Sequence, residues 1–406
     1  MSKQVRPEVE SFARIRVVGV GGSGGNAVNH MVSSHVQGVD FVAVNTDGQD
    51  LHKNKAKRKI HIGKSITRGL GTGMNADLGK QAADETREEI QDAVKGSDMV
   101  FITCGMGGGT GTGAAPVVAK IARELGALTV GVVTKPFAFE GAQRARLAET
   151  GIADLRKAVD AVIIIPNDKL LSIVTRETGI RNAFAMCDDI LKQAVEGISD
   201  LITQTGIINV DFADVRAVMQ NAGSALMGIG TGIGEKRAEH AARAAINSPL
   251  LEVSINGAKG VLFSIAGGDD LGMLEVQDAA NVITEAIDPD AKVIFGAVTD
   301  PTLKKGAIRV TVIATGFPEG TTRSSIFGGP QRFNLKKEQD VPPATPRPTL
   351  REALSRDSDR DDKKKHEEKP VSPRASVPTE HKDATKVKDE DDEDGWGGLP
   401  SFLRRR

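Results

Sequence analysis

The residue types best suited to binding phosphate lie in a glycine-rich run at positions 104–113, which reads CGMGGGTGTG. The run follows a short apolar segment at 99–103 and leads into a helical pattern at 114–122. Glycine has no Cβ, so the backbone can turn its N–H groups toward an anion, and the following helix directs its positive end at the same point. The two threonines add hydroxyl donors. We therefore predict a phosphate-binding loop rather than a flexible turn.

A second glycine-rich run, GGSGGN at 21–26, follows the apolar segment 15–20 and leads into a helix expected from about 27 to 34. The spacing Gly19-x-Gly21-x-x-Gly24 matches the dinucleotide-binding fingerprint, and Asp47 lies near the distance expected for its ribose contact. An NAD-dependent oxidoreductase with a doubly wound sheet is therefore the alternative function. A P-loop ending at 63–65 is excluded, because position 58 is Arg where that motif needs Gly.

Apolar strands and amphipathic helices alternate through the first part of the chain. Strands are predicted at 15–20, 41–46, 99–103, 128–134 and 161–166, and helices at 27–34, 77–94, 114–122 and 141–159. Continuous apolar strands of this kind indicate a parallel sheet covered on both faces, whose ligands bind at the carboxyl ends of the strands. Residues 51–66 are basic and are predicted as solvated surface, and 69–75 as a polar loop that can reach a ligand.

A long helix predicted at 181–205 has a broad apolar face and should join two domains. Beyond it, helices are predicted up to about 220, at 235–247 and at 270–287, with strands at 260–266, 292–298 and 307–315. The predicted fold class is α/β: a parallel-sheet domain at 14–180, the core helix at 181–205, and a second α/β domain with a mixed or antiparallel sheet at 206–317.

The two ends of the chain have a different composition. Residues 318–388 are rich in Pro, Ser and charged residues and nearly empty of aliphatics, which predicts a disordered linker. At 389–406 an acidic run precedes an apolar cluster that includes Trp396, Leu399 and Phe402, which is typical of a docking peptide on a tether. Residues 1–13 are predicted to be a flexible arm.

Composition excludes several function classes. The formal net charge of −1 gives no electrostatic case for binding nucleic acid. Cys104 and Cys187 lack metal-ligand spacing and indicate a reducing compartment. No stretch is apolar for long enough to span a bilayer, and the polar N-terminus does not resemble a signal peptide. A cytoplasmic protein without direct membrane insertion is the expectation.

Three separated motifs resemble those of the tubulin/FtsZ family, and of its bacterial cell-division branch in particular. GGGTGTG at 107–113 is similar to the family signature, NVDFAD at 209–214 to the catalytic loop, and LPSFLR at 399–404 to the C-terminal peptide. The resemblance covers about 14–317 plus that peptide. It implies an assembly-dependent GTPase that hydrolyses GTP to GDP and phosphate, with GTP/GDP and Mg²⁺ as cofactors. It further implies a cytoskeletal protein whose head-to-tail protofilaments build the bacterial division ring.

The implied partners are further copies of the chain, in a homopolymer. Through residues 396–406, membrane-tethering and regulatory division proteins of the FtsA type would also bind. The implied location is the division site, beneath the inner membrane.

The resemblance also assigns a GTP site residue by residue. The phosphate loops match at Gly21, Gly22, Ser23, Gly24, Gly25 and Asn26, and at Gly107, Gly108, Gly109, Thr110 and Gly111. Glu140 and Arg144 match residues near the ribose and phosphates. Asn167, Phe184 and Asp189 match base-binding positions, where the ring stacks on guanine and Asp189 accepts from both guanine N–H groups. Without the resemblance, Phe184 would be interpreted as core and Asp189 as a solvated helix acid.

Asp211 and Asp214 allow two interpretations. An Asp at a helix start with an acid three residues later is ordinary N-terminal capping. The resemblance instead makes both residues catalytic, acting on the neighbouring subunit's GTP by orienting and polarising water. No metal ligand is assigned. The loop at 69–77 reads GLGTGMNAD, where the family commonly has GLGAGANPE, which leaves the Mg²⁺ geometry open.

Overall fold

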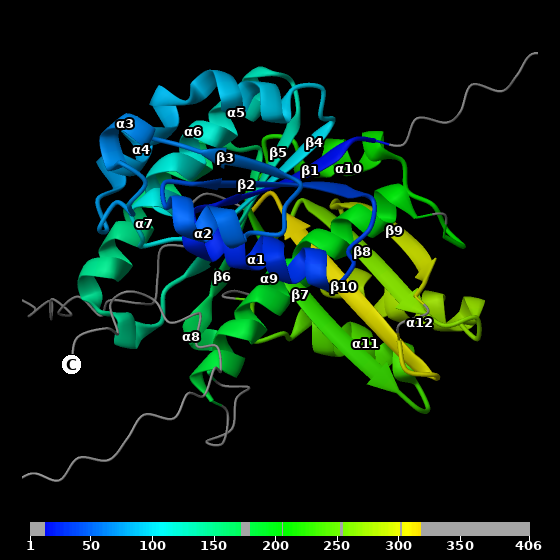
Figure 1. Ribbon diagram of the computed structural model, residues 1–406. Coiled ribbons are helices and arrows are strands. Elements are labelled where there is room, and N and C mark those ends of the chain that lie inside the picture. The colour runs from blue at the N-terminus through cyan, green and yellow to red at the C-terminus, as the bar shows by residue number, and fades with distance from the viewer. Residues whose placement is uncertain (1–12, 172–178, 205, 252–254, 301–302, 318–406) are drawn as a thin grey trace, which may run out of the picture. The chain divides into compact units, whose positions relative to one another are not determined.

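The computed structural model describes residues 13–171, 179–204, 206–251, 255–300 and 303–317. Within them, ten strands form one sheet in the order β3-β2-β1-β4-β5-β6-β7-β10-β8-β9 (Figure 1). Trp396 and the rest of the predicted linker and docking peptide, from 318 onward, lie outside the described residues, as do residues 1–12 of the predicted arm. No helix in the described ranges is long and apolar enough to cross a membrane.

The first half of the sheet is parallel throughout, as predicted. Its strands are β1 (Ile15–Val20), β2 (Val39–Asn45), β3 (Arg58–His61), β4 (Met99–Gly105), β5 (Leu128–Lys135) and β6 (Ala161–Pro166). Strand β3 corrects the prediction of solvated surface at 51–66. Its Ile60 and the following Ile62 are buried, while the charged neighbours Arg58 and Lys59 are exposed. A strand at a sheet edge with this composition is hard to distinguish from basic surface.

The second half of the sheet is mixed, also as predicted. Its strands are β7 (Gly223–Ile233), β8 (Gly260–Gly267), β9 (Lys292–Thr299) and β10 (Ala307–Thr315). β10 pairs antiparallel with β7 and β8, β8 pairs parallel with β9, and β7 joins this half to β6 by parallel pairing. Both predicted domains thus contribute strands to a continuous sheet, and the domain boundaries themselves stay a prediction.

Strand β7 was missed, because its sequence GSALMGIGTGI looks like a series of glycine turns. The structure explains the glycines. A Cβ on Gly228, Gly230 or Gly232 would lie within 2.1 Å of a backbone oxygen of helix α11 (Arg237–Ile246). The alternate glycines therefore allow this helix to lie directly on the strand, a close approach that a glycine in a strand often marks.

Helices cover both faces of the sheet. α1 (Gly21–Ser33), α9 (Ile180–Thr203) and α10 (Phe212–Met219) pack on one face. The other face is covered by α4 (Ala76–Glu85), α5 (Arg87–Val94), α6 (Thr110–Glu124) and α7 (Ala142–Ala158), and in the second half by α11 and α12 (Met273–Thr284). The remaining short helices are α2 (Gly48–Lys53), α3 (Lys64–Thr67), η1 (Ala138–Glu140) and α8 (Asn167–Leu170).

Two helix predictions need correction. The helix predicted at 77–94 is divided at Thr86 into α4 and α5, and both glycine-rich loops are shorter than predicted because α1 begins at Gly21 and α6 at Thr110. The core helix α9 was predicted well. Its buried face, which includes Leu191 and Ile198, belongs to the same hydrophobic core as Leu262 of β8 and Ile313 of β10. This helix therefore contacts both halves of the sheet.

Candidate functional site

The two glycine-rich runs meet at the carboxyl ends of adjacent strands. β1 and β4 pair in the middle of the first half-sheet, and α1 and α6 start directly after them. A Cβ on Gly21, which has a φ of +73°, would lie 3.0 Å from the backbone N of Gly111, and one on Gly24 would lie 2.4 Å from the Thr103 oxygen. Side chains at these positions would separate the two helix starts. Their absence lets two sets of free backbone N–H groups share one edge of the sheet.

Three buried hydroxyls lie beside these helix starts. Thr110 Oγ1 is 2.8 Å from Thr46 Oγ1 and 3.3 Å from Thr72 Oγ1. Thr72 belongs to the loop at 69–75, so that loop contacts the glycine run at 104–113. Gly109 is part of the same contact, since a Cβ there would lie 2.0 Å from Thr72 Oγ1. Thr46 was not predicted as a site residue, although its place after a parallel strand next to β1 was a usable signal.

An acidic side chain lies close to the start of α1. Asp50 Oδ2 accepts from Asn45 Nδ2 at 2.8 Å and is 3.7 Å from the point where a Cβ of Gly22 would lie. Burial, followed by the neighbouring Asp47, raises the pKa of Asp50 above its usual value. Asp47 itself caps α2 by accepting from the amides of Gln49 and Asp50. The oxidoreductase alternative assigns Asp47 to a ribose contact. Its role as the N-cap of α2 accounts for this residue without such a contact.

Glu140 and Arg144 lie next to the glycine run at 104–113. Glu140 accepts from the Phe137 amide at 2.9 Å and forms an ion pair of 3.2 Å with Arg144 Nε. A Cβ on Gly107 would lie 2.7 Å from the Arg144 backbone oxygen, so these two segments are in contact. Asn167 Oδ1 is buried and makes no hydrogen bond to the described residues, whereas the buried Nε of Arg144 has its ion pair with Glu140. A buried carbonyl oxygen usually has a hydrogen-bond partner, so a ligand is a natural partner for Asn167.

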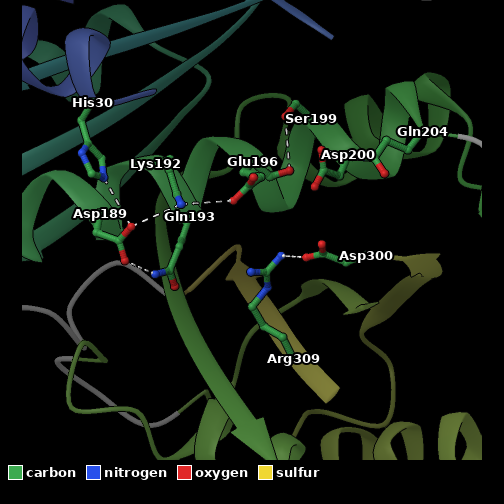
Figure 2. Close-up of polar contacts among 10 residues, drawn as sticks. All are labelled: His30, Asp189, Lys192, Gln193, Glu196, Ser199, Asp200, Gln204, Asp300 and Arg309. Atoms are coloured by element: carbon green, nitrogen blue, oxygen red, sulfur yellow. Dashed lines mark hydrogen bonds and ion pairs between the residues drawn. The ribbon is translucent and has the colours of Figure 1, made fainter. Parts of the chain in front are cut away.

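The base-binding candidates on α9 are arranged less simply. Phe184 is 42% exposed and meets Phe137 edge to face, at 5.4 Å between ring centroids. Asp189 contacts other protein groups: Figure 2 shows it between His30 Nε2, at 3.4 Å, and Gln193. Burial favours a higher pKa for Asp189, but Lys192, His30 and Gln193 together hold it below its usual value. Asp189 is therefore a charged group with partners of its own.

The adjacent Asp188 differs from Asp189 in the direction of its pKa shift and in its hydrogen bonding. Burial raises its pKa to about 6, against the opposing influence of His30, and no hydrogen bond joins it to another described residue. It follows Phe184 by one helical turn, so the two side chains lie on the same face of α9. Sequence reasoning missed Asp188, although this spacing from Phe184 was available as a signal.

Asp211 and Asp214 lie far from the groups above. Asp211 caps α10 by accepting from the Ala213 amide at 3.1 Å, and both acids are exposed. Arg216 of the same helix donates to the carbonyl oxygens of Asp98 and Gly126, which precede β4 and β5. α10 therefore lies at the amino ends of strands whose carboxyl ends carry the glycine runs. The seven residues of β4 put about 20 Å between the two edges.

The structure thus brings the two glycine runs, Glu140, Arg144 and Asn167 together where the carboxyl ends of the parallel strands lie, which we call the carboxyl edge of the sheet. Asp211 and Asp214 lie where the amino ends of the same strands lie, which we call the amino edge. Within the described residues, no cluster of three or more His, Cys, Asp or Glu side chains could hold a metal ion. A divalent cation at the first edge would depend largely on oxygens of a bound ligand.

Comparison with known proteins gives a consistent picture. The model of the Tubulin/FtsZ family GTPase domain matches residues 14–175, and that of the FtsZ family C-terminal domain matches 223–318. An empty FtsZ dimer from M. jannaschii is 48% identical, with a TM-score of 0.73, over 76% of this chain and 89% of that one. A point mutant of that FtsZ matches equally well, over 75% of this chain and 92% of that one.

A GTPγS-bound CetZ protofilament from Haloferax volcanii has a similar fold. It is 23% identical, with a TM-score of 0.65, over 75% of this chain and 94% of that one. None of these findings supports the oxidoreductase alternative. The chain belongs to the FtsZ family of tubulin-like GTPases, the cytoskeletal proteins of cell division.

Proposed function

We propose that this GTPase binds GTP at the edge of the sheet where α1 and α6 begin. The amides of residues 21–26 and 107–111 would hold the phosphates, assisted by the hydroxyl of Thr110. Glu140 and Arg144 would contact the ribose and phosphates, and the close approach of Arg144 to Gly107 supports that role. Mg²⁺ would offset phosphate charge, and Asp50 with the threonine hydroxyls offers the oxygen chemistry that this ion prefers.

The guanine base would lie between Phe184 and Asn167, read by a carboxylate of α9. The resemblance assigns that carboxylate to Asp189. A second assignment, to Asp188, is supported by its place on the same helix face as Phe184 and by the absence of a hydrogen bond to any described residue. In this arrangement, Asp189 positions the helix through His30, and Asp188 accepts from the guanine N–H groups.

Hydrolysis would require two subunits. The observation that carries this proposal is the separation of Asp211 and Asp214 from the glycine runs by the length of a strand. No motion within one folded subunit can bring the acids at the amino ends of the strands to the glycine runs at the carboxyl ends. Head-to-tail stacking would place the acids of one subunit against the γ-phosphate of the next, where exposed carboxylates can orient and polarise the attacking water. The capping bond of Asp211 fits this role, because it holds the carboxylate at the helix start.

The experiment that tests the shared site mixes two inactive proteins. Asp214→Ala keeps its GTP-binding edge but loses the acid, and Thr110→Ala keeps the acid but loses a phosphate contact. Each alone should hydrolyse GTP poorly, whereas the mixture should recover part of the activity, because Asp214 of one subunit serves GTP on the other. Mixing Asp214→Ala with Asp211→Ala is the control, since neither supplies an intact acid pair. A mixture no more active than its components would contradict the shared site.

The chain would assemble into protofilaments at the division site in the cytoplasm. Residues 396–406 would bind membrane-tethering and regulatory proteins of the FtsA type, because an apolar cluster with a basic end at the tip of a long polar segment suits a groove with an acidic rim. Deletion of 396–406 should abolish binding of a purified FtsA-type protein and leave polymerisation by light scattering unchanged. Retained binding would place the docking peptide elsewhere.

A further inference from the structure

Strand β9 is the outermost strand of the second half of the sheet, and it pairs with β8 on its inner side (Figure 1). The backbone groups of Ala297 point to the outer side, where they pair with those of Ile208. Backbone groups alternate in direction along a strand, so those of Val293 and Phe295 also point outward. No described residue hydrogen-bonds to them. Within the described residues, this stretch of β9 is therefore an uncovered sheet edge.

The side chains on this stretch are large and apolar. Val293 is 37% exposed and Phe295 is 36% exposed, and Phe295 stacks on the buried Phe263 at 5.3 Å between ring centroids. The opposite end of the sheet differs, because the short strand β3 has the exposed charged side chains of Arg58 and Lys59. Charge keeps an edge strand from pairing, whereas an apolar edge with outward backbone groups is a template for another strand. The edge of β9 therefore favours a further strand.

The described part of the chain ends close to the beginning of this edge. The Lys259 amide donates to the Thr315 oxygen at 3.0 Å, and the Lys292 amide donates to the Lys259 oxygen at 2.9 Å. Gly316, with a φ of +73°, lies against Lys259, and Phe317 packs on the hydrophobic core of the second half-sheet. The chain therefore leaves Phe317 at the end of the sheet where β9 begins.

The sequence that follows Phe317 has the pattern of a turn and a strand. Residues 318–330 lie outside the described residues and read PEGTTRSSIFGGP. Pro and Gly at 318 and 320 are typical of a turn, and the Thr, Ile and Phe residues within 321–327 are typical of a strand. Gly-Gly-Pro at 328–330 would end that strand. This stretch thus differs from the charged remainder of the predicted linker.

The connection is long enough to reach the outer side of β9. A new strand there would lie three strand spacings from β10, which is about 14 Å. Residues 318–322 can span up to about 17 Å when extended. Because β10 runs antiparallel to β8, and β8 runs parallel to β9, a chain that leaves the end of β10 starts where β9 starts. The new strand would therefore run parallel to β9.

We propose that residues 323–327 of the same chain form a further strand on β9 and pair with the outward backbone groups of Val293 and Phe295. Ile326 and Phe327 are neighbours and point to opposite faces of a strand, so one of them extends the apolar surface of Phe295 in either register. The added strand keeps this edge from pairing with other copies of the chain. The polar linker then begins after the glycines at 328–329.

Amide hydrogen exchange tests the added strand in three proteins: the full chain, a chain that ends at 330 and a chain that ends at 317. In the shortest chain, the amides of Val293 and Phe295 should exchange about tenfold faster than in the other two, because each loses a hydrogen-bond partner. The amide of Ile294 points toward β8 and should exchange equally in all three. Overlapping peptides analysed by mass spectrometry separate these amides.

Equal exchange of Val293 and Phe295 in the three proteins would overturn the proposal. So would fast exchange in the chain that ends at 330, because the cover would then come from a later segment. The measurement uses no nucleotide, so its result does not depend on the proposed GTPase site.

Proline substitutions in the full chain test the pairing residue by residue. Proline has no N–H and is tolerated in an edge strand only where that N–H would face solvent. Of Ser324→Pro and Ser325→Pro, the one whose N–H faces β9 should speed the exchange of Val293 and Phe295 as much as truncation at 317 does. Ser358→Pro makes the same change within the predicted linker and should have no effect. No effect of either Ser324→Pro or Ser325→Pro would overturn the strand.

A second copy of the chain is the competing occupant of this edge, and protein concentration distinguishes the two. Pairing within one chain does not depend on concentration, so the protection of Val293 and Phe295 in the full chain should persist on dilution. Protection that is lost on dilution would show that another copy covers β9, and the proposal would be wrong.

Discussion

The carboxyl edge and the amino edge of the sheet differ in the residue types that form them. At the carboxyl edge, glycines let two helix starts and a loop pack closely around buried threonines. At the amino edge, Asp211 and Asp214 are exposed side chains on a short helix, held by ordinary capping. In the proposed function, the first edge binds GTP within one subunit, whereas the second would acquire a catalytic role only when another subunit approaches it. The difference suggests that binding and hydrolysis can be separated by mutation.

The largest expected effect is at the amino edge. Asp214→Ala should lower GTP turnover by about 10²–10⁴-fold, the usual contribution of a group that activates water, and leave GTP affinity within about twofold. Turnover by the assembled protein and equilibrium binding to the monomer are the two measurements. Asp278→Asn, which changes an exposed acid on α12, is the control. A parallel collapse of affinity would mean that the capping role of this helix start dominates and that the two edges are not independent.

The opposite pattern is expected at the carboxyl edge. Gly109→Ala introduces a Cβ only 2.0 Å from Thr72 Oγ1 and 2.8 Å from backbone atoms of Asn75, so two loops must move apart. GTP affinity should fall by roughly 100-fold, equivalent to about 2.7 kcal/mol, measured by titration of the nucleotide-free monomer. Gly179→Ala is the matched control, because no atom of the residues that the structure describes lies within 4 Å of a Cβ built there. Equal losses in both variants would show that Gly109 is not part of the site.

Base recognition should show a smaller effect, which sharpens the description of the carboxyl edge. Asp188→Asn puts a donor against the guanine N–H groups, and a mispaired buried group costs about 1–3 kcal/mol. Discrimination of GTP over ATP should therefore fall by roughly tenfold to a hundredfold, in competition binding. Asp189→Asn should change it less, because His30 and Gln193 already occupy that carboxylate. A larger loss of discrimination in Asp189→Asn than in Asp188→Asn would show that Asp189 is the residue that contacts the base.

The same contrast explains what the sequence could predict. Glycine loops and apolar periodicity are visible in the residue types themselves, so the parallel sheet, the core helix and the meeting of the two glycine runs followed from the sequence pattern. Strand β7 did not, because the reason for Gly228, Gly230 and Gly232 lies in helix α11, which only the folded chain places against them. Thr46 was not predicted as a site residue because its contact with Thr110 joins positions far apart in the sequence. Asp188 was not predicted because the resemblance pointed to the adjacent Asp189.

The smallest expected effect tests one hydroxyl at the carboxyl edge. Thr46 is fully buried, and its Oγ1 lies 2.8 Å from that of Thr110, which Thr72 also approaches. Thr46→Val keeps the shape and removes one hydrogen bond, and a single neutral hydrogen bond contributes about 0.5–1.5 kcal/mol. GTP affinity should therefore weaken by roughly twofold to tenfold, measured by titration of the monomer. Turnover per bound GTP should be unchanged, because Asp211 and Asp214 are untouched.

Thr46→Ser is the control, since it restores the hydroxyl and loses only a methyl group. Serine should recover most of the affinity if the hydroxyl acts through Thr110. If serine binds GTP as weakly as valine, the methyl packing at Thr46 matters more than its hydrogen bond. If instead Thr46→Val lowers turnover per bound GTP, the carboxyl edge contributes to the chemical step, and the division between a binding edge and a catalytic edge is too simple.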